Sequence, residues 1–143
     1  MGHDTHRSAP GGELLLGGVV VSDQWHLLGH SDADVVLHAV TDALLGAVAM
    51  GDIGDLFPDT DSENQGRDSA EMLKLAFQQV RQADYHLWNL DCTVFADHPK
   101  LGPNKRAMCR RIAEILEVPE DRVGLQAKTG ERVGPIGRRE AIA

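Results

Sequence analysis

The sequence predicts an α/β or α+β fold, because segments with helical periodicity alternate with segments that have the composition of strands. The chain has 143 residues, which suits one compact domain, and 42% of them are hydrophobic, enough for a real core. No internal repeat, low-complexity tract or linker divides the sequence. We therefore expect residues 1–143 to form one domain.

Residues 14–21 are expected to form a hairpin, because their apolar side chains flank Gly17-Gly18 and a glycine pair suits a tight turn between strands. The next segment, Asp34 to Met50, is the clearest helix. Its apolar residues recur at helical spacing and form a wide face that consists of Val35, Leu37, His38, Val40, Leu44, Leu45 and Val48.

Residues 52–67 are rich in Gly, Asp, Pro and Ser and have no periodicity. We expect a long loop there, and loops of this length are usually functional or mobile. The sequence Asp68-Ser69-Ala70-Glu71 is typical of a capping box and predicts a second helix that runs to about Ala83.

Alternating residues predict a strand from Leu87 to Ala96, with one apolar face made of Leu90, Cys92, Val94 and Ala96. Pro103 and Asn104 begin a third predicted helix, and Pro119 ends it because proline cannot continue a helix. A last strand is expected from Arg122 to Thr129.

The net charge of −8, without a basic stripe, argues against nucleic acid or an anionic membrane as a partner. No apolar run approaches about 18 residues, so no membrane helix is expected. The N-terminus has no signal-peptide profile. Cys92 and Cys109 form no zinc or redox pattern, and we interpret them as reduced and buried, which fits a cytoplasmic (bacterial) or plastid-like compartment.

Asp4 and His6 are two residues apart, so on an extended segment their side chains would share one face. A carboxylate and an imidazole on one face can bind Zn²⁺, and His38 is a candidate third ligand; three ligands with an open position would be of the catalytic kind. The alternative is that Asp4 and His6 lie in a frayed terminus and that His38 is a hydrogen-bonded core histidine. Spacing alone leaves both interpretations open.

The segment His30-Ser31-Asp32-Ala33-Asp34 precedes the first predicted helix, where Ser31 or Asp32 is a suitable N-cap. Free backbone N–H groups at that end, together with the helix dipole, would favour an anion. The alternative is plain capping without a ligand.

Three loop aspartates, Asp52, Asp59 and Asp61, either cap turns and face water or bind sugar hydroxyls. Glu131 follows Thr129 near the end of the last strand, where a carboxylate could hold Mg²⁺ that bridges phosphate oxygens. The cations nearest these motifs, which either bind an anion or remain solvated surface, are Lys100, Lys128, Arg132 and Arg138.

In this order, the motifs resemble those of the 2-C-methyl-D-erythritol 2,4-cyclodiphosphate synthase family over essentially the whole chain. The matching stretches are Asp4-Thr5-His6, His30-Ser31-Asp32-Ala33-Asp34, Asp52-Ile53-Gly54, Phe57-Pro58-Asp59-Thr60-Asp61, Ala96 with Pro99-Lys100, and Lys128-Thr129-Gly130-Glu131. Ala33 departs from the glycine of the family pattern, and alanine would be strained if the position needs a positive φ.

The resemblance implies a mixed β-sheet with helices packed on one face, in a homotrimer with active sites between subunits. It implies that a cytidine diphosphate-methylerythritol 2-phosphate becomes the cyclic diphosphate and releases CMP, in non-mevalonate isoprenoid biosynthesis. The family's members carry strand residues before the first motif and an apolar segment after the position of Ala143. We therefore expect edge structure to be missing at both ends of this chain.

By the same resemblance, Asp4, His6 and His38 bind Zn²⁺, and Glu131 holds a second divalent ion, Mg²⁺ or Mn²⁺, on the substrate diphosphate. His30 and Thr129 are expected to stabilise the transition state. The residues expected to bind the substrate are Asp4, His6, His30, Ser31, Asp52, Ile53, Gly54, Phe57, Asp59, Thr60, Asp61, Ala96, Pro99, Lys100, Leu101, Lys128, Thr129, Glu131 and Arg138.

Two other functions remain open at this point. One is a non-catalytic homologue that binds a nucleotide or an isoprenoid diphosphate. The other is a metal-dependent phosphohydrolase, which would activate a water molecule and release inorganic phosphate.

Overall fold

The computed structural model describes all residues, 1–143, and divides the strands into three hydrogen-bonded ladders. Two are antiparallel and one is parallel. The ladders are β4-β1-β7 (Trp25–Leu27, His6–Pro10, Ala141–Ile142), β2-β3 (Leu14–Leu16, Val19–Ser22) and β5-β6 (Leu90–Phe95, Val123–Lys128). Hydrogen bonds between Ala143 and Phe95 in both directions, 2.6 and 3.1 Å long, join the end of β7 to the end of β5.

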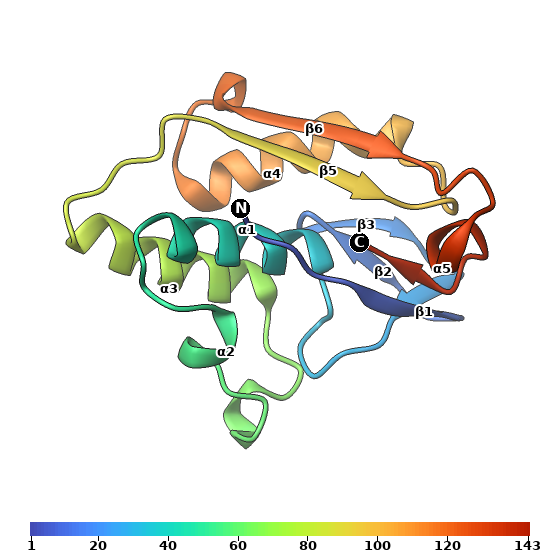
Figure 1. Cartoon of the computed structure of the whole chain (residues 1–143), viewed down its shortest axis with the longest axis horizontal. Coiled ribbons are helices and arrows are strands. Elements are labelled where there is room, and N and C mark those ends of the chain that lie inside the picture. The colour runs from blue at the N-terminus through green and yellow to red at the C-terminus, as the bar shows by residue number, and fades with distance from the viewer.

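Three longer helices pack with these strands, and two single-turn helices lie in loops. The helices are α1 (Val35–Ala47), α2 (Ile53–Leu56), α3 (Ser69–Gln82), α4 (Lys105–Leu116) and α5 (Gly134–Gly137). Helix α4 lies behind the β5-β6 ladder, α1 and α3 run side by side, and α2 lies in the loop that hangs below α1 (Figure 1). No helix is both long and apolar enough to span a membrane.

The mixed α/β class and the main predicted elements are confirmed. The predicted hairpin is β2-β3, and its turn residues Gly17 and Gly18 both have a positive φ, 60° and 72°. The three predicted helices are α1, α3 and α4, and the two predicted longer strands are β5 and β6. On β5 the residues Leu90, Cys92 and Val94 face inward, as their alternation predicts.

Strands β1, β4 and β7 were not predicted, because their local sequence carries no strand signal. The sequence of β1 is His-Arg-Ser-Ala-Pro, and it is a strand only because Ser8 pairs with Leu27 and His6 pairs with Ile142. Such long-range pairing leaves no periodic pattern in a short segment. The cysteines also differ from expectation, since both are free but only half-buried. Burial, followed by the charge of Asp91, raises the pKa of the Cys92 thiol to about 12.

The start of α3 confirms the predicted cap but not the reciprocal half of the box. The Asp68 carboxylate accepts from the N–H of Ala70 at 2.7 Å, as an N-cap does. The Glu71 carboxylate instead lies 3.7 Å from the Arg67 guanidinium. A complete capping box occurs at α2, between Asp52 and Asp55.

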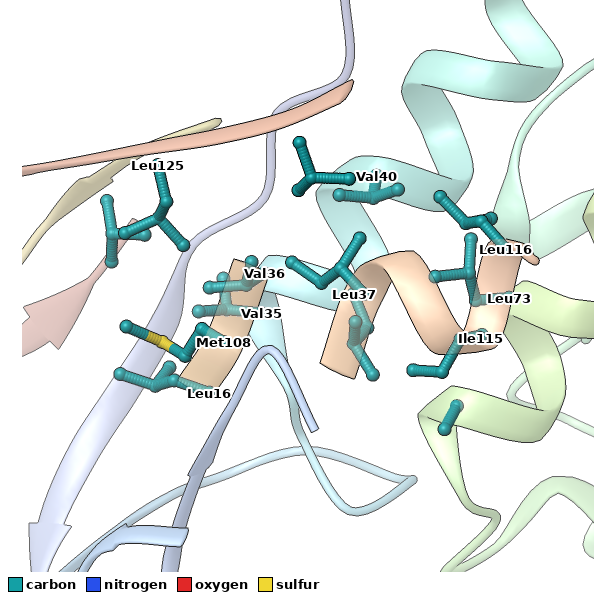
Figure 2. Close-up of a cluster of buried hydrophobic side chains, with 14 of the residues drawn as sticks. Leu16, Val35, Val36, Leu37, Val40, Leu73, Met108, Ile115, Leu116 and Leu125 are labelled. Carbon is teal, nitrogen blue, oxygen red and sulfur yellow. The ribbon is translucent and has the colours of Figure 1, made fainter. Parts of the chain in front are cut away.

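One hydrophobic cluster lies between the helices and the ladders. Figure 2 shows side chains from α1, α3 and α4 gathered with Leu16 of β2 and Leu125 of β6. Leu37 and Leu73 are 1% and 0% exposed, so they lie fully inside this cluster. Because α1 and α3 bury their apolar faces here, the core fixes how both helices pack against each other and against the strands.

We expect Leu73→Ala to lower the free energy of unfolding by about 2–5 kcal/mol, through lost apolar contact and the cavity that remains. Urea denaturation followed by circular dichroism measures this change. The matched control is Leu28→Ala, at a side chain that is 47% exposed, where the change should stay within about 0.5 kcal/mol. Equal losses in the two variants would contradict the assignment of the core.

Candidate metal centre and substrate site

Asp4, His6 and His38 form a metal-binding triad, although His38 lies more than thirty residues after the other two. His38 Nδ1 lies 3.0 Å from Asp4 Oδ2 and 3.1 Å from His6 Nε2. His6 Nε2 lies 3.4 Å from the same Asp4 oxygen. The prediction that folding brings these three side chains together is confirmed.

The strand pairing explains why the N-terminal ligands do not fray. His6 is the first residue of β1, which pairs with β7 on one side and with β4 on the other. His38 is buried on α1, 8% exposed, and turns its Nδ1 toward the strand. The first part of the alternative interpretation, a frayed terminus, is therefore wrong, whereas its second part holds, since His38 is buried and hydrogen-bonded.

The spacing and chemistry of the three donors suit a zinc ion. In a tetrahedral zinc site with bonds of about 2.0–2.1 Å, two ligand atoms lie roughly 3.3 Å apart. The three contacts, 3.0, 3.1 and 3.4 Å, fall around that value. Two imidazoles and one carboxylate leave a fourth position open, which is typical of catalytic rather than structural zinc sites.

The pKa values of Asp4 and His6 are both shifted toward the forms that bind a metal. Burial raises the pKa of Asp4, but the hydrogen bond with His38 and the charge of His6 outweigh it, so the pKa lies below its ordinary value. Burial lowers the pKa of His6, and the opposing charge of Asp4 does not restore it. A carboxylate and a neutral imidazole are the forms that coordinate a metal.

The predicted N-caps of α1, Ser31 and Asp32, are wrong, because Asp34 occupies that position. Its fully buried carboxylate accepts from Val36 and Leu37 in the first helical turn, and from Gly17 and Gly18 in the hairpin turn. The helix N–H groups that could have bound an anion are thus occupied by the chain's own carboxylate. The plain capping interpretation is the one that the structure supports.

Ser31 and Asp32 instead turn toward the metal triad and α3, whereas His30 is exposed to solvent. Ala33 is buried and has a φ of 60°, so the position does need the left-handed conformation that favours glycine. Ala33 therefore holds a backbone conformation that an alanine side chain disfavours.

The loop of residues 52–67 is more ordered than its composition predicted. It contains α2 and a 3₁₀ turn at Ser62–Asn64, which Asp61 caps through the N–H of Glu63. The Arg67 guanidinium lies 4.9 Å from the centre of the Phe57 ring. Asp52 and Asp61 are therefore exposed capping residues, and either can still present a carboxylate oxygen to a ligand.

Other predicted site residues follow β5 and β6, whose ends lie at the right of Figure 1, away from the loop that contains α2. Ala96 and Leu101 are buried, so any ligand there would meet backbone atoms or the exposed side chain of Lys100. The Thr129 hydroxyl donates to Glu131 Oε1 at 2.7 Å.

The four cations that sequence analysis singled out are not gathered around the triad. Arg138 is bound to Glu140 through two hydrogen bonds of 2.8 and 2.9 Å. Lys100, Lys128 and Arg132 are exposed and make no ion pair. In this chain, the predicted site residues thus fall into two groups: one is the triad with the loop of residues 52–67, and the other lies in the loops after β5 and β6.

The contacts behind His38 were not foreseen. Ser69, the first residue of α3, lies with its hydroxyl 2.8 Å from His38 Nε2, and Asp32 holds Ser69 in turn. No spacing rule joins residues on two helices, so the sequence alone carried no signal for this contact.

The chain matches the model of the YgbB family over residues 1–143. It is 50% identical, over 143 residues, to the 2-C-methyl-D-erythritol 2,4-cyclodiphosphate synthase of Rhodopirellula baltica, and the match covers 100% of this chain and 86% of that protein.

Two solved structures have the same fold. A 2-C-methyl-D-erythritol 2,4-cyclodiphosphate synthase with bound CDP is 38% identical, has a TM-score of 0.90, and is matched over 99% of this chain and 91% of its own. The CDP complex of IspF from Plasmodium falciparum is 32% identical, with a TM-score of 0.86 and coverage of 99% and 86%.

We expect His38→Ala to remove most of the bound metal, because a site with three protein donors loses one of them. Metal content after dialysis, measured by inductively coupled plasma mass spectrometry, checks this. His26→Ala is the control, since His26 contacts the carbonyl oxygen of Gly11 and lies outside the triad. Unchanged metal in His38→Ala would show that the triad is not the binding site.

Proposed function

Since the chain belongs to the 2-C-methyl-D-erythritol 2,4-cyclodiphosphate synthase family, we propose that its triad holds zinc and that its site is completed by a neighbouring subunit. The chain is a lyase of non-mevalonate isoprenoid biosynthesis. It forms the cyclodiphosphate from 4-diphosphocytidyl-2-C-methyl-D-erythritol 2-phosphate, and CMP is the other product. The observation that carries the proposal is the Asp4, His6 and His38 triad in a chain similar to this family over its whole length.

The reaction needs no nucleophile from the protein. An oxygen of the substrate's own 2-phosphate attacks the β-phosphorus, a new P–O bond closes the ring, and the bond to CMP breaks. What the protein supplies is positioning of the two phosphates and stabilisation of their charge. This explains why the chain needs no activated serine, cysteine or lysine at its site.

Bound metal ions would offset the negative charge of the substrate. Divalent ions at the triad and at Glu131 would withdraw negative charge from the phosphate oxygens. Glu131 suits Mg²⁺ or Mn²⁺, because a single exposed carboxylate can share such an ion with substrate phosphates. Thr129 donates to that carboxylate and so orients it.

The remaining residues are assigned by their place in the motifs. His30, Ser31, Phe57 and Asp59 meet the methylerythritol phosphate, and Asp52 and Gly54 meet the ribose. His30 and Thr129 stabilise the transition state. Residues 96–101 hold the cytosine through backbone atoms, which agrees with the burial of Ala96 and Leu101. Arg138 lies near the phosphate or the trimer axis.

Separation of the predicted residues within one subunit supports a homotrimer with shared sites. The triad and the loop of residues 52–67 would come from one subunit, and the loops after β5 and β6 from its neighbour. A cyclic trimer makes three identical heterologous interfaces, each of which can pair the two groups.

Incubation of the protein with the diphosphocytidyl substrate, Zn²⁺ and Mg²⁺, followed by phosphorus NMR, tests the activity. We expect CMP and a cyclic diphosphate to appear together, and a chelator to stop both. Release of inorganic phosphate would identify a phosphohydrolase instead. No turnover, although CMP binds, would identify a non-catalytic nucleotide-binding homologue.

A mixing experiment tests the shared site. His38→Ala and Glu131→Gln should each abolish most activity as pure proteins, because each removes an ion-binding group from every site. If random mixed trimers form, about one quarter of the sites will pair an intact triad with an intact Glu131 and regain activity.

A mixture of two separate preparations of His38→Ala is the control, and it should stay inactive. Failure of the mixed trimers to regain activity, when sedimentation shows that subunits have exchanged, would place the triad and Glu131 in the same subunit's site.

A further inference from the structure

We propose that Asp32 and Ser69 are positioning residues that orient His38 for metal binding, through a chain of hydrogen bonds from Asp32 to Ser69 to His38. This inference rests on the proposed zinc site. Ser69 Oγ lies 2.8 Å from His38 Nε2, on the side of the ring opposite the atom that faces Asp4 and His6. Ser69 itself is fully buried, at 0% exposed.

The carboxylate of Asp32 fixes the donor and the acceptor in each of these hydrogen bonds. Its Oδ1 accepts a short hydrogen bond from the Ser69 hydroxyl, and its Oδ2 accepts from the Ser69 backbone N–H at 3.0 Å. An ionised carboxylate can only accept, so the single hydroxyl proton of Ser69 points to Asp32. Ser69 Oγ therefore turns a lone pair toward His38.

That arrangement determines which ring nitrogen of His38 carries the proton. Nε2 must carry the proton in order to donate to Ser69, and Nδ1 is left with the lone pair that faces the other two ligands. A histidine that binds a metal is usually oriented in this way by an acceptor on its other nitrogen. These hydrogen bonds set both the tautomer and the rotation of the His38 ring.

Ser31 is the competing partner for the same nitrogen. Its hydroxyl lies 3.0 Å from His38 Nε2, but it is half-buried and has no carboxylate behind it. Ser69 has the shorter contact, the deeper burial and the fixed proton. The geometry therefore assigns the orienting role to Ser69.

Zinc affinity of the full chain, measured by competition with a chromophoric chelator, tests the proposal. Ser69→Ala removes the acceptor, and we expect affinity to fall about 10–100-fold, as for other partners of metal-binding histidines. Asp32→Asn should also weaken binding, because asparagine keeps only one of the two oxygens that accept from the N–H and the hydroxyl of Ser69, and its NH₂ group cannot accept. Ser69→Thr keeps the hydroxyl and should restore most of the affinity.

Asp68→Asn is the matched control, since Asp68 caps the same helix through Ala70 but does not contact His38. It should change the thermal midpoint little, because asparagine caps a helix about as well as aspartate, and it should leave zinc affinity unchanged. With Co²⁺ in place of zinc, the visible absorption bands should shift in Ser69→Ala and not in Asp68→Asn, because only the former frees the ring to rotate.

The outcomes separate this inference from the proposed zinc site. If the wild-type chain binds no zinc, both are overturned. If it binds zinc and Ser69→Ala and Asp32→Asn bind it equally well, the orienting role alone is overturned. The orienting role would also be overturned if zinc affinity fell as much in Asp68→Asn as in Ser69→Ala, or if it fell more in Ser31→Ala.

Discussion

The buried carboxylate of Asp34 joins the β2-β3 turn to the first turn of α1, and the position of the metal centre follows from that contact. Four backbone N–H groups from two elements converge on its two oxygens. Burial nevertheless raises the pKa of this carboxyl, ahead of the opposing effect of those N–H groups. An unpaired buried acid would be costly, so the hairpin and the helix must stay together wherever Asp34 remains inside. His38 lies one helical turn further along α1, and its ring inherits that fixed placement.

An acidic chain can bind an anionic substrate only if the charge is reversed locally. The net charge is −8, and the positively charged side chains near the motifs are exposed or already paired. A divalent ion held by one carboxylate and two neutral imidazoles leaves a site with a net positive charge. The low pKa of His6 serves this end, because a protonated imidazole would expel the ion. An ion at the triad would thus place positive charge where the side chains of this acidic chain do not.

Much of the fold was predictable because the periodic spacing of apolar residues within each segment indicates its secondary structure. Helices α1, α3 and α4 carry apolar faces at helical spacing, and β5 alternates. The features that were not predicted depend on residues distant in sequence. Strand β1 forms by pairing with strands that contain Leu27 and Ile142. The N-cap Asp34 also accepts a hydrogen bond from the glycine turn of the hairpin. The candidate site divides in the same way. The spacing of Asp4 and His6 suggested a metal, whereas Ser69 is recognisable as a partner of His38 only in three dimensions.

The antiparallel pairing of His6 with Ile142 also dictates an order of assembly. Strand β7 follows β1 and β4 in the sequence, so during translation β1 has only β4 as a neighbour until β7 has left the ribosome. Contacts between residues so far apart in sequence form late and slowly, because the intervening chain must first be ordered. The β4 side of β1 can therefore pair early, whereas His6, whose partner is Ile142, waits for β7. Strand β1, which carries His6, is thus closed on both sides only when β7 joins it.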